Sequence, residues 1–334
     1  MTTARAFRLK AEAPLTHFQG ELCPSAEAWR PAFRLRQGSG GAAVALRGGW
    51  VAGRLSPAFT LSALALAAAL VLSPHTLLHA GLDGFQEPRG QPVWSDEFDT
   101  PGLPNPASWS YDVGGHGWGN RELQFYTEGR RENARVEGGR LIIEARREDW
   151  QGKPYTSARL NSRASWTYGR IDVRAKLPRG RGTWPAIWML PVRGEYGKGG
   201  WPDNGEIDIM EHVGFDPGVI HGTIHSRAYN HVDRTQRGKT TTVADAQDAF
   251  HLYSASWTPQ SIVVSVDNAS YFSFDNERLS NPRADWRQWP FDKDFRILLN
   301  VAVGGNWGGQ KGVDESVWPQ RLEIDYVRVY QVKR

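Results

Sequence analysis

Cysteine is almost absent from this chain of 334 residues, which contains only Cys23. A disulfide framework and a cysteine-ligated metal site each need several cysteines, so the sequence excludes both. An HExxH zinc motif and an EF-hand loop are also missing from the sequence. Zinc-peptidase chemistry and an EF-hand calcium site are therefore excluded as well.

Positive charge is in small excess, and this excess lies near the N-terminus. The formal net charge is +4, from 40 Lys and Arg against 36 Asp and Glu. Residues 1–80 hold eight basic and three acidic side chains, which leaves 32 basic against 33 acidic in residues 81–334. The larger part of the chain therefore lacks the basic surface of a nucleic-acid-binding protein, and we expect no nucleic-acid partner.

No apolar run is long enough for a membrane helix. The longest, residues 61–72, has 12 residues, whereas a spanning segment needs about 18 or more. It follows Arg54 and precedes a small residue, Ala80, as in a bacterial signal peptide. We therefore predict a signal peptide over residues 54–80, cleavage after Ala80, and a secreted or periplasmic protein.

Residues 1–53 lie ahead of Arg54, although a signal peptide normally begins within a few residues of its positively charged segment. We interpret them as an N-terminal extension upstream of the true start, which we place near Val51, read from a GTG codon. A genuine extension or an uncleaved signal anchor is the alternative. Neither interpretation changes the expected catalytic region, residues 81–334.

Helical periodicity is scarce after Ala80, where only a short stretch between Arg278 and Gln288 favours a helix. Residues 168–177 instead alternate apolar and charged side chains, the pattern of a half-buried strand. Similar runs occur at 141–145, 186–190, 262–266, 297–303 and 324–332, and the turn signals between them lie at 138–139, 178–182, 197–200, 267–268 and 304–305. The pattern predicts one all-β domain, a sandwich or barrel of antiparallel strands.

Tryptophan is abundant, since 13 of the 15 lie in residues 81–334. A globular core needs few of them, whereas sugar-binding clefts stack pyranose rings on aromatic faces. The composition therefore favours a carbohydrate ligand.

Three carboxylates fall within six residues of a strand-like run, GEIDIMEH at 205–212. On a regular strand Glu206 and Asp208 share a face, whereas Glu211 points to the other side. A β-bulge around Ile209 and Met210 would return Glu211 to the carboxylate face. Three acids on one face repel one another, which pushes their pKa values apart.

Such a row fits retaining glycoside hydrolysis, in which one carboxylate attacks the anomeric carbon and a protonated one serves the leaving oxygen. The two carboxyl groups must come within about 5–5.5 Å, so Glu206 and Glu211 have to lean together over Asp208 on a strongly curved sheet. A solvated or salt-bridged outer strand face is the alternative reading.

The run at 205–212 resembles the signature of glycoside hydrolase family 16, in the form with an extra Met that is typical of bacterial laminarinases, the endo-β-1,3-glucanases. The resemblance continues in family order over residues 91–331 and does not include residues 1–80. Its other motifs are WSDEF (94–98), GWGNRELQFYT (117–127), TSARLNSR (156–163), GTWPAIWML (182–190), NVAVGGNWG (300–308) and DYVRVYQ (325–331).

The resemblance implies a β-jelly-roll sandwich of two curved antiparallel sheets with an open concave cleft. By position, Glu206 would be the nucleophile, Glu211 the general acid/base, and Asp208 the residue that hydrogen-bonds the nucleophile. The activity implied is retaining hydrolysis of internal β-1,3-glucosidic bonds of laminarin-type glucans. No organic cofactor and no protein partner are implied, and a monomer is expected.

Ten further residues are implied to bind the glucan. Trp184 and Trp188, four apart on one strand face, would be platforms for glucosyl rings, and their alternative role is in the core. The remaining eight are Trp201, Asn120, Arg121, Glu122, Arg159, His225, Asn306 and Trp307. Ordinary loop polarity, a structural histidine and a surface ion pair are the alternatives for the polar members of this set. His212, directly after Glu211, is expected to support the site rather than take part in catalysis.

A structural Ca²⁺ on the convex side, away from the chemistry, is a further implication. The family ligands are an N-terminal Glu, a Gly carbonyl and a C-terminal Asp, which match Glu97, Gly139 and Asp325. Oxygen ligands suit this ion. Three unrelated residues with no bound ion are the alternative.

Other functions remain open at this point. Within the family they are a glucanase for mixed β-1,3/1,4-glucan and a galactan hydrolase. From other classes they are a non-catalytic β-glucan-binding module and a structural role in the cell envelope. Retention of Glu206, Asp208 and Glu211 argues against the binding module, because a pure binder does not need two carboxylates facing one bond.

Overall fold

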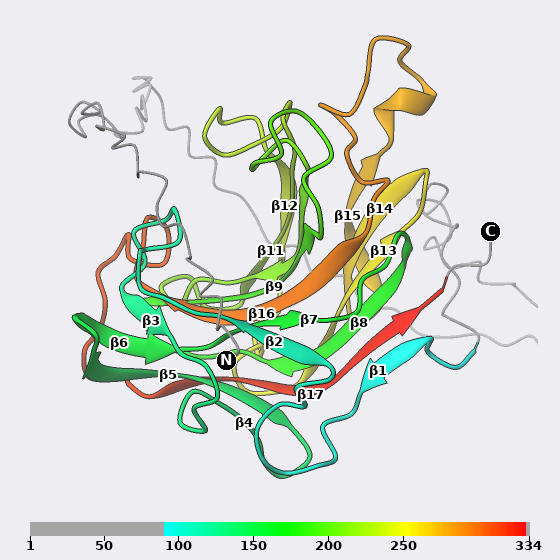
Figure 1. Cartoon of the computed structure of the whole chain (residues 1–334). Helices are drawn as coiled ribbons and strands as arrows, with labels where there is room; N and C mark the ends of the chain where they lie inside the picture. The colour runs from blue at the N-terminus through cyan, green and yellow to red at the C-terminus, as the bar shows by residue number, and fades with distance from the viewer. Residues whose placement is uncertain (1–89, 332–334) are drawn as a thin grey trace, which may run out of the picture. The chain divides into compact units, whose positions relative to one another are not determined.

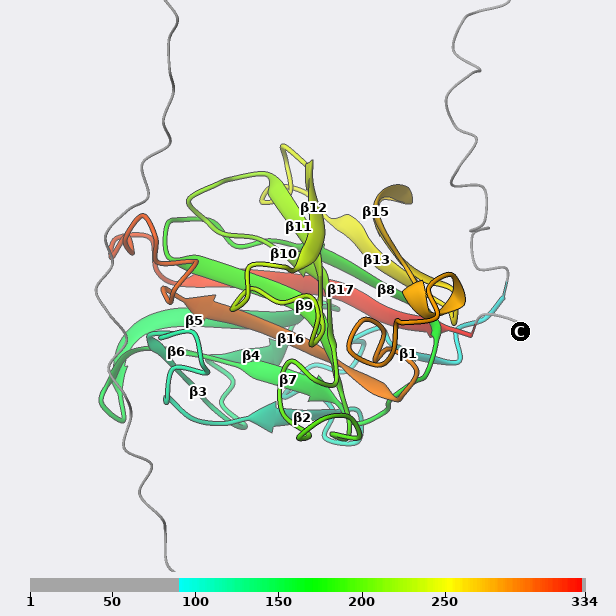
Figure 2. The same ribbon diagram turned by 90° about the horizontal axis from the view of Figure 1, so that it is seen from above.

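The computed structural model describes residues 90–331 of the chain, and these form two β-sheets stacked face to face (Figure 1). The seven-stranded sheet has the order β12 (Arg237–Thr242), β11 (Val219–His225), β10 (Glu206–Glu211), β9 (Thr183–Pro191), β16 (Phe295–Val303), β7 (Arg159–Ser162) and β2 (Trp109–Asp112). All of its neighbouring strands are antiparallel. Figure 2 shows this sheet from above, with β9, β10 and β16 near its centre.

The ten-stranded sheet forms the second layer. Its order is β15 (Ala269–Asp275), β14 (Ser261–Val266), β13 (His251–Trp257), β8 (Gly169–Lys176), β17 (Gln320–Tyr330), β5 (Leu141–Trp150), β6 (Lys153–Ser157) and β3 (Gln124–Tyr126), with β1 (Trp94–Asp96) beside β17 and β4 (Ala134–Val136) beside β5. Only the short β3–β6 pair is parallel. The prediction of an all-β jelly-roll sandwich is confirmed.

The core lies between the two sheets and follows the alternation of the sequence. On β8, Ile171, Val173 and Ala175 are fully buried against the other sheet. On the opposite face of β8, Arg170 and Asp172 form a buried ion pair with a 2.6 Å N–O distance, and Arg170 also donates to Ser254 and Asn268. The charged face of the predicted strand is therefore less exposed than a period-2 pattern alone would indicate.

Helix is restricted, within residues 90–331, to one 3₁₀ turn, η1 (Glu277–Leu279). Asn276 caps it by accepting a hydrogen bond from the backbone N–H of Arg278. Pro282 disfavours helical backbone at the residue before it, which explains why the helix predicted between Arg278 and Gln288 is limited to this turn. No helix in the described range is long and apolar enough to cross a membrane.

The N-terminal predictions fall on other residues. The extension 1–53, the signal peptide 54–80 and the domain start at residue 81 all lie outside the range that the structure describes. They stay predictions.

Candidate active site

Strand β10 contains the predicted bulge. In the pairing of β10 with β9, Asp208 lies opposite Trp188, and Met210 lies opposite Ile187, the residue adjacent to Trp188. Ile209 has no partner on β9 and is therefore the extra residue. The pairing with β11 shifts between Asp208 and Glu211 in the same way. The inserted residue returns Glu211 to the face of the strand that carries Glu206 and Asp208. The β-bulge predicted around Ile209 and Met210 is therefore confirmed.

The bulge sorts the side chains of β10 between the two faces of the sheet. The three apolar ones, Ile207, Ile209 and Met210, are fully buried in the core. The three acidic ones, Glu206, Asp208 and Glu211, line a cleft on the outer face. The extra residue Ile209, inserted between Asp208 and Met210, is thus what lets three carboxylates share one surface.

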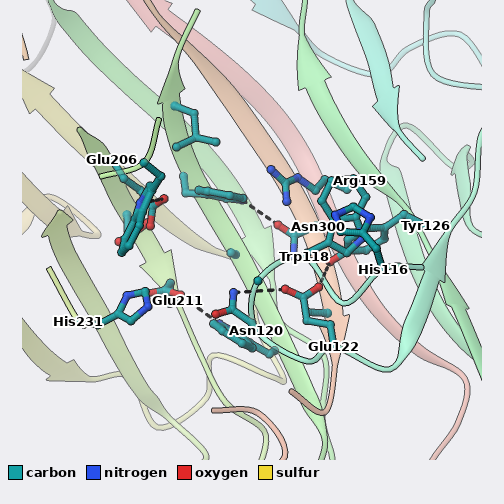
Figure 3. Close-up of a pocket in the computed structure, with 18 of the residues that line it drawn as sticks. His116, Trp118, Asn120, Glu122, Tyr126, Arg159, Glu206, Glu211, His231 and Asn300 are labelled. Carbon is teal, nitrogen blue, oxygen red and sulfur yellow. Dashed lines mark hydrogen bonds between the residues drawn. The ribbon is translucent and has the colours of Figure 1, made fainter. Parts of the chain in front are cut away.

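The cleft has a volume of about 560 Å³. Strands β7, β9, β10 and β16 form its floor, and Figure 3 shows Glu206, Glu211 and His231 on one side of it and His116, Trp118, Tyr126 and Arg159 on the other. The other lining residues are Gly119, Asn120, Glu122, Trp184, Ala186, Trp188, Leu190, Trp201, Asp208, Val232, Asn300 and Ala302.

A glycine fixes where the carboxylate strand begins. Gly205 has φ of +86°, and a Cβ at this position would lie 2.7 Å from the ring of Phe291. Only glycine combines this backbone conformation with such a close approach. The packing of Gly205 against the core therefore sets the position of Glu206, the next residue.

Burial raises the pKa of all three carboxyl groups in the cleft. After burial, the charge of Asp208 further raises the pKa of Glu206, and the charge of Glu211 further raises that of Asp208. The pKa of Glu211 is raised by burial but is held down by His225 and by a hydrogen bond from Trp184. Three negative charges this close are costly, so burial and mutual repulsion both favour the protonated forms of these carboxyl groups.

Two indole N–H groups mark the two ends of the carboxylate row. Trp201 donates to Oε2 of Glu206 at 3.0 Å. Trp184 donates to Oε1 of Glu211 at 3.0 Å. A donor to an ionised carboxylate stabilises its charge, so both tryptophans act on the acids as well as offering aromatic surface.

His225 lies behind the carboxylates and does not itself line the cleft. It is buried, and its Nε2 is 3.3 Å from Asp208 Oδ2 and 3.8 Å from Glu206 Oε1. His231, from the loop after β11, does line the cleft, and its ring packs on Trp201 at 4.8 Å between centroids. His225 therefore contacts the carboxylates from behind, whereas His231 is the histidine that faces the open cleft.

Arg159 lies between two tryptophans at the far side of the cleft. Its guanidinium carbon is 4.8 Å from the ring centroid of Trp118 and 4.6 Å from that of Trp188. Its Nε is 2.8 Å from Oδ2 of Asp112. The ion pair and the two rings fix the guanidinium, which is the preorganisation that recognition of sugar hydroxyls needs.

Glu122 is the centre of a buried hydrogen-bond network. It accepts from Gln124 at 2.6 Å and from Tyr126 at 3.2 Å. Asn300 donates to the Tyr126 hydroxyl at 3.1 Å and accepts from the Trp188 indole at 2.8 Å. Burial raises the pKa of Glu122. This carboxylate therefore organises the cleft floor, and its bonds within the protein compete with the predicted bonds to sugar hydroxyls.

Not every predicted binding residue reaches the cleft. Arg121 is exposed, with φ of +56° in a turn, and Asn306 is also exposed, and neither lines the cleft. Trp307 lies behind the lining, 5.5 Å from Trp184 and 4.8 Å from His221 between ring centroids. The predicted residues that do line it are Asn120, Glu122, Arg159, Trp184, Trp188, Trp201, Glu206, Asp208 and Glu211.

Sequence reasoning missed five polar or aromatic lining residues: His116, Trp118, Tyr126, His231 and Asn300. Trp118, Tyr126 and Asn300 fall within the two motifs 117–127 and 300–308, so their positions could have been found there. His231 carried no signal, because its place in the cleft depends on packing against Trp201 and His225.

Of the residues predicted to hold calcium, Glu97, Gly139 and Asp325, the two carboxylates are engaged in ion pairs. Both carboxylate oxygens of Glu97 accept from Arg328, at 3.0 and 2.8 Å, which lowers the pKa of Glu97. Asp325 accepts from Arg174 at 2.6 Å. Guanidinium groups thus take the anionic oxygens and add positive charge where a cation would bind. As arranged, these residues do not fit the ion, and calcium binding stays a prediction without support.

Comparison with known proteins identifies relatives of this cleft. Residues 121–328 match the family model for glycosyl hydrolases family 16. A beta-glucanase of Rhodothermus marinus is 62% identical over 246 residues, which cover 73% of this chain and 86% of that protein. A glucan endo-1,3-beta-glucosidase of Cryptopygus antarcticus is 39% identical, over 70% of this chain and 90% of that protein.

Solved structures give the same result. The X-ray structure of the laminarinase from Rhodothermus marinus superposes with a TM-score of 0.73 at 62% identity, covering 74% of this chain and all of that one. A non-specific endo-beta-1,3(4)-glucanase, co-crystallised with a glucan oligosaccharide, superposes with a TM-score of 0.68 at 48% identity, over 74% of this chain and 98% of that one.

Proposed function

This chain belongs to glycosyl hydrolases family 16 and is a glycoside hydrolase, and we propose that it cleaves internal β-1,3-glucosidic bonds of laminarin-type glucans with retention of configuration. The observation that carries the proposal is the bulge of β10, which presents Glu206, Asp208 and Glu211 together on one wall of a tryptophan-lined cleft. The relatives named a beta-glucanase and a laminarinase support the substrate class.

In the first step, Glu206 is the nucleophile. Its carboxylate attacks the anomeric carbon while the bond from that carbon to the glycosidic oxygen breaks, and Glu211 gives its proton to the leaving oxygen. The product is a glycosyl ester on Glu206. The raised pKa of Glu211 supports its role as the acid, because a buried carboxyl group keeps its proton until it is needed.

In the second step, water enters from the cleft. Glu211, now ionised, takes a proton from the water, whose oxygen attacks the anomeric carbon and releases Glu206. Two inversions give net retention. Asp208 lies between the two glutamates, and burial and the charge of Glu211 raise its pKa. In its protonated form it would donate to Glu206 and so moderate the negative charge of the nucleophile as it forms and leaves.

The rest of the cleft would bind the glucan chain. Trp184, Trp188 and Trp201 offer ring faces for glucosyl units, and Arg159 and Asn120 offer donors to their hydroxyl groups. The polar groups on the far side, held by the Glu122 network, would orient the chain across β9 and β16. Binding along the whole cleft suits an internal bond of a polymer.

Mixed β-1,3/1,4-glucan is the second candidate substrate, because a relative of 48% identity is a non-specific endo-beta-1,3(4)-glucanase. Reducing ends released from laminarin, barley mixed-linkage glucan, agarose and carrageenan, assayed side by side, test both candidates. We expect laminarin to be the best substrate and Glu206→Gln to abolish its cleavage. A folded wild type that binds laminarin and cleaves none of the four polymers would contradict the proposal.

The remaining predictions on export and assembly belong to the same proposal. A secreted or periplasmic location suits an enzyme for a polymer that does not enter cells. The predicted signal peptide, residues 54–80, is tested by N-terminal sequencing of the native protein, which should begin at Gly81. A monomer that needs no partner protein is expected in size-exclusion chromatography with light scattering.

A further inference from the structure

Three atoms of metal-ligand type converge at the Glu206 end of the carboxylate row. His225 Nε2 lies 3.3 Å from Asp208 Oδ2 and 3.8 Å from Glu206 Oε1. One such atom from each of the three residues lies within 4.8 Å of the other two. Ligand atoms at about 2.0–2.2 Å from one tetrahedral zinc ion are roughly 3.3–3.6 Å apart, so two of the three separations are already close to those of a filled site.

Two of these groups are buried, and one of them has an oxygen without a hydrogen bond on the side of the cluster. Asp208 is 2% exposed and His225 is 6% exposed. Asp208 Oδ2 has no hydrogen-bond partner among the described residues, and within the cluster it lies 3.3 Å from His225 Nε2. An indole holds the Oε2 atom of Glu206 and leaves Oε1 free to face the histidine. Buried polar atoms in proteins are almost always paired, so an unpaired carboxylate oxygen beside an imidazole marks a place for a ligand.

We propose that Glu206, Asp208 and His225 form a binding site for one zinc-like divalent cation, which competes with the glucan for the cleft. One imidazole with two carboxylates selects Zn²⁺ or Cu²⁺ over the harder Mg²⁺ and Ca²⁺. Three protein ligands leave a fourth position open, and it faces the cleft, because Glu206 and Asp208 line the cleft while His225 lies behind them.

A second imidazole supports the assignment. His231 lines the open side of the cluster, with its ring centroid 5.2 Å from that of His225. The competition with glucan rests on the proposed function, since it assumes that Glu206 must reach the substrate, whereas the binding of the ion does not.

The molecule offers a matched control at His251. This histidine also lies between two carboxylates, with Nδ1 2.7 Å from Asp267 and Nε2 3.2 Å from Asp245. These contacts use opposite nitrogens of the ring, so one ion cannot join all three residues. His251→Gln therefore removes a His–carboxylate cluster without removing the proposed site.

Isothermal titration of the full chain with Zn²⁺ tests the binding. We expect His225→Ala to weaken one site by at least about tenfold, since even loss of an outer-shell partner costs roughly 10–100-fold, and His251→Gln to leave that site unchanged. Asp208→Asn, which keeps the side-chain volume, should weaken it too and guards against a folding defect in the first variant. Unchanged zinc affinity in both His225→Ala and Asp208→Asn would overturn the proposal.

Two further measurements locate the ion and its effect. Anomalous diffraction at the zinc edge from a soaked crystal should show a peak bonded to the three residues, and a peak elsewhere alone would contradict the site. Zn²⁺ should raise the apparent KM for laminarin without lowering kcat, reversibly with EDTA. Zinc that binds at the site without changing the KM would overturn the competition. An inactive wild type that still binds zinc there would count against the proposed function alone.

Discussion

The indole of Trp184 donates a hydrogen bond to Oε1 of Glu211 at 3.0 Å. Trp184 lies on β9, and Glu211 is the last residue of β10. The bulge places Glu211 opposite Ala186, two residues from Trp184 on β9, so the two side chains lie on the same face of the sheet. Burial raises the pKa of Glu211 and this bond lowers it. A residue expected to bind sugar is therefore also part of the control of the proposed acid/base.

Trp184→Phe should move the basic limb of the pH profile of kcat/KM to higher pH. The phenyl ring keeps an aromatic surface but cannot donate, so the ionised form of Glu211 loses a stabilising bond and its pKa rises. The acid then keeps its proton to higher pH. Trp188→Phe is the control, because its indole bonds to Asn300 instead. A limb that stays in place, or moves down, contradicts this role.

Asp208→Asn should raise the melting temperature at neutral pH while it reduces activity. The pKa of Asp208 is raised in the folded state, so its contribution to stability is full below the ordinary value of 3.8 and is lost as pH rises through the folded pKa. The neutral amide avoids that loss. Each unit of pKa elevation corresponds to about 1.4 kcal/mol, or roughly 3–6 °C. Calorimetry at pH 3.5 and pH 7 should show the gain only at pH 7.

Arg159→Met should raise the KM for laminarin by about 10- to 150-fold, the equivalent of the roughly 1.5–3 kcal/mol of a hydrogen bond to a charged group, and leave kcat nearly unchanged. Arg130→Met is the matched control, because Arg130 also lies over an indole, that of Trp150 at 4.5 Å, but outside the cleft. Steady-state kinetics on laminarin for both variants measure the KM and kcat that test this prediction. Equal effects of the two substitutions would mean that the arginine–tryptophan contact matters for folding alone.

His212 should make the protein less stable in acid. Burial lowers its pKa to about 4, so its contribution to stability is present above the unfolded value of 6.5 and is lost as pH falls through about 4. The loss amounts to about 3 kcal/mol. His212→Gln cannot take up this proton, and its free energy of unfolding should fall less between pH 7 and pH 4. Parallel urea-unfolding curves for the two proteins over this range would refute the assignment.

The sequence predicted most of what depends on local pattern. The spacing of Glu206, Asp208 and Glu211, with apolar residues between them, required a bulge, because no regular strand can place three such acids on one face and still bury Ile209 and Met210. The fold class followed from period-2 runs and turn residues in the same way. The bulge and the fold class were both inferred from the alternation of side chains between the two faces of a strand.

What the sequence could not predict depends on contacts across the chain. Glu122 reads as a loop acid, yet its burial under the cleft floor turns it into an acceptor for Gln124 and Tyr126. His231 reaches the cleft because its ring packs against Trp201 and His225, which are distant in sequence or separated from it by a loop. The Glu97–Arg328 pair depends on β1 lying beside β17. Such pairings are set by tertiary packing, which residue spacing does not encode.

Chemical rescue of Glu206→Ala with azide tests the assignment of the nucleophile most directly. Azide can take the place of the missing carboxylate and attack the anomeric carbon once, with Glu211 still supplying the proton. The account predicts recovered cleavage of a laminari-oligosaccharide with a good leaving group and an α-configured glycosyl azide in the ¹H NMR spectrum, from a single inversion. A β-configured azide, or no rescue in a variant that folds and binds laminarin, would contradict it.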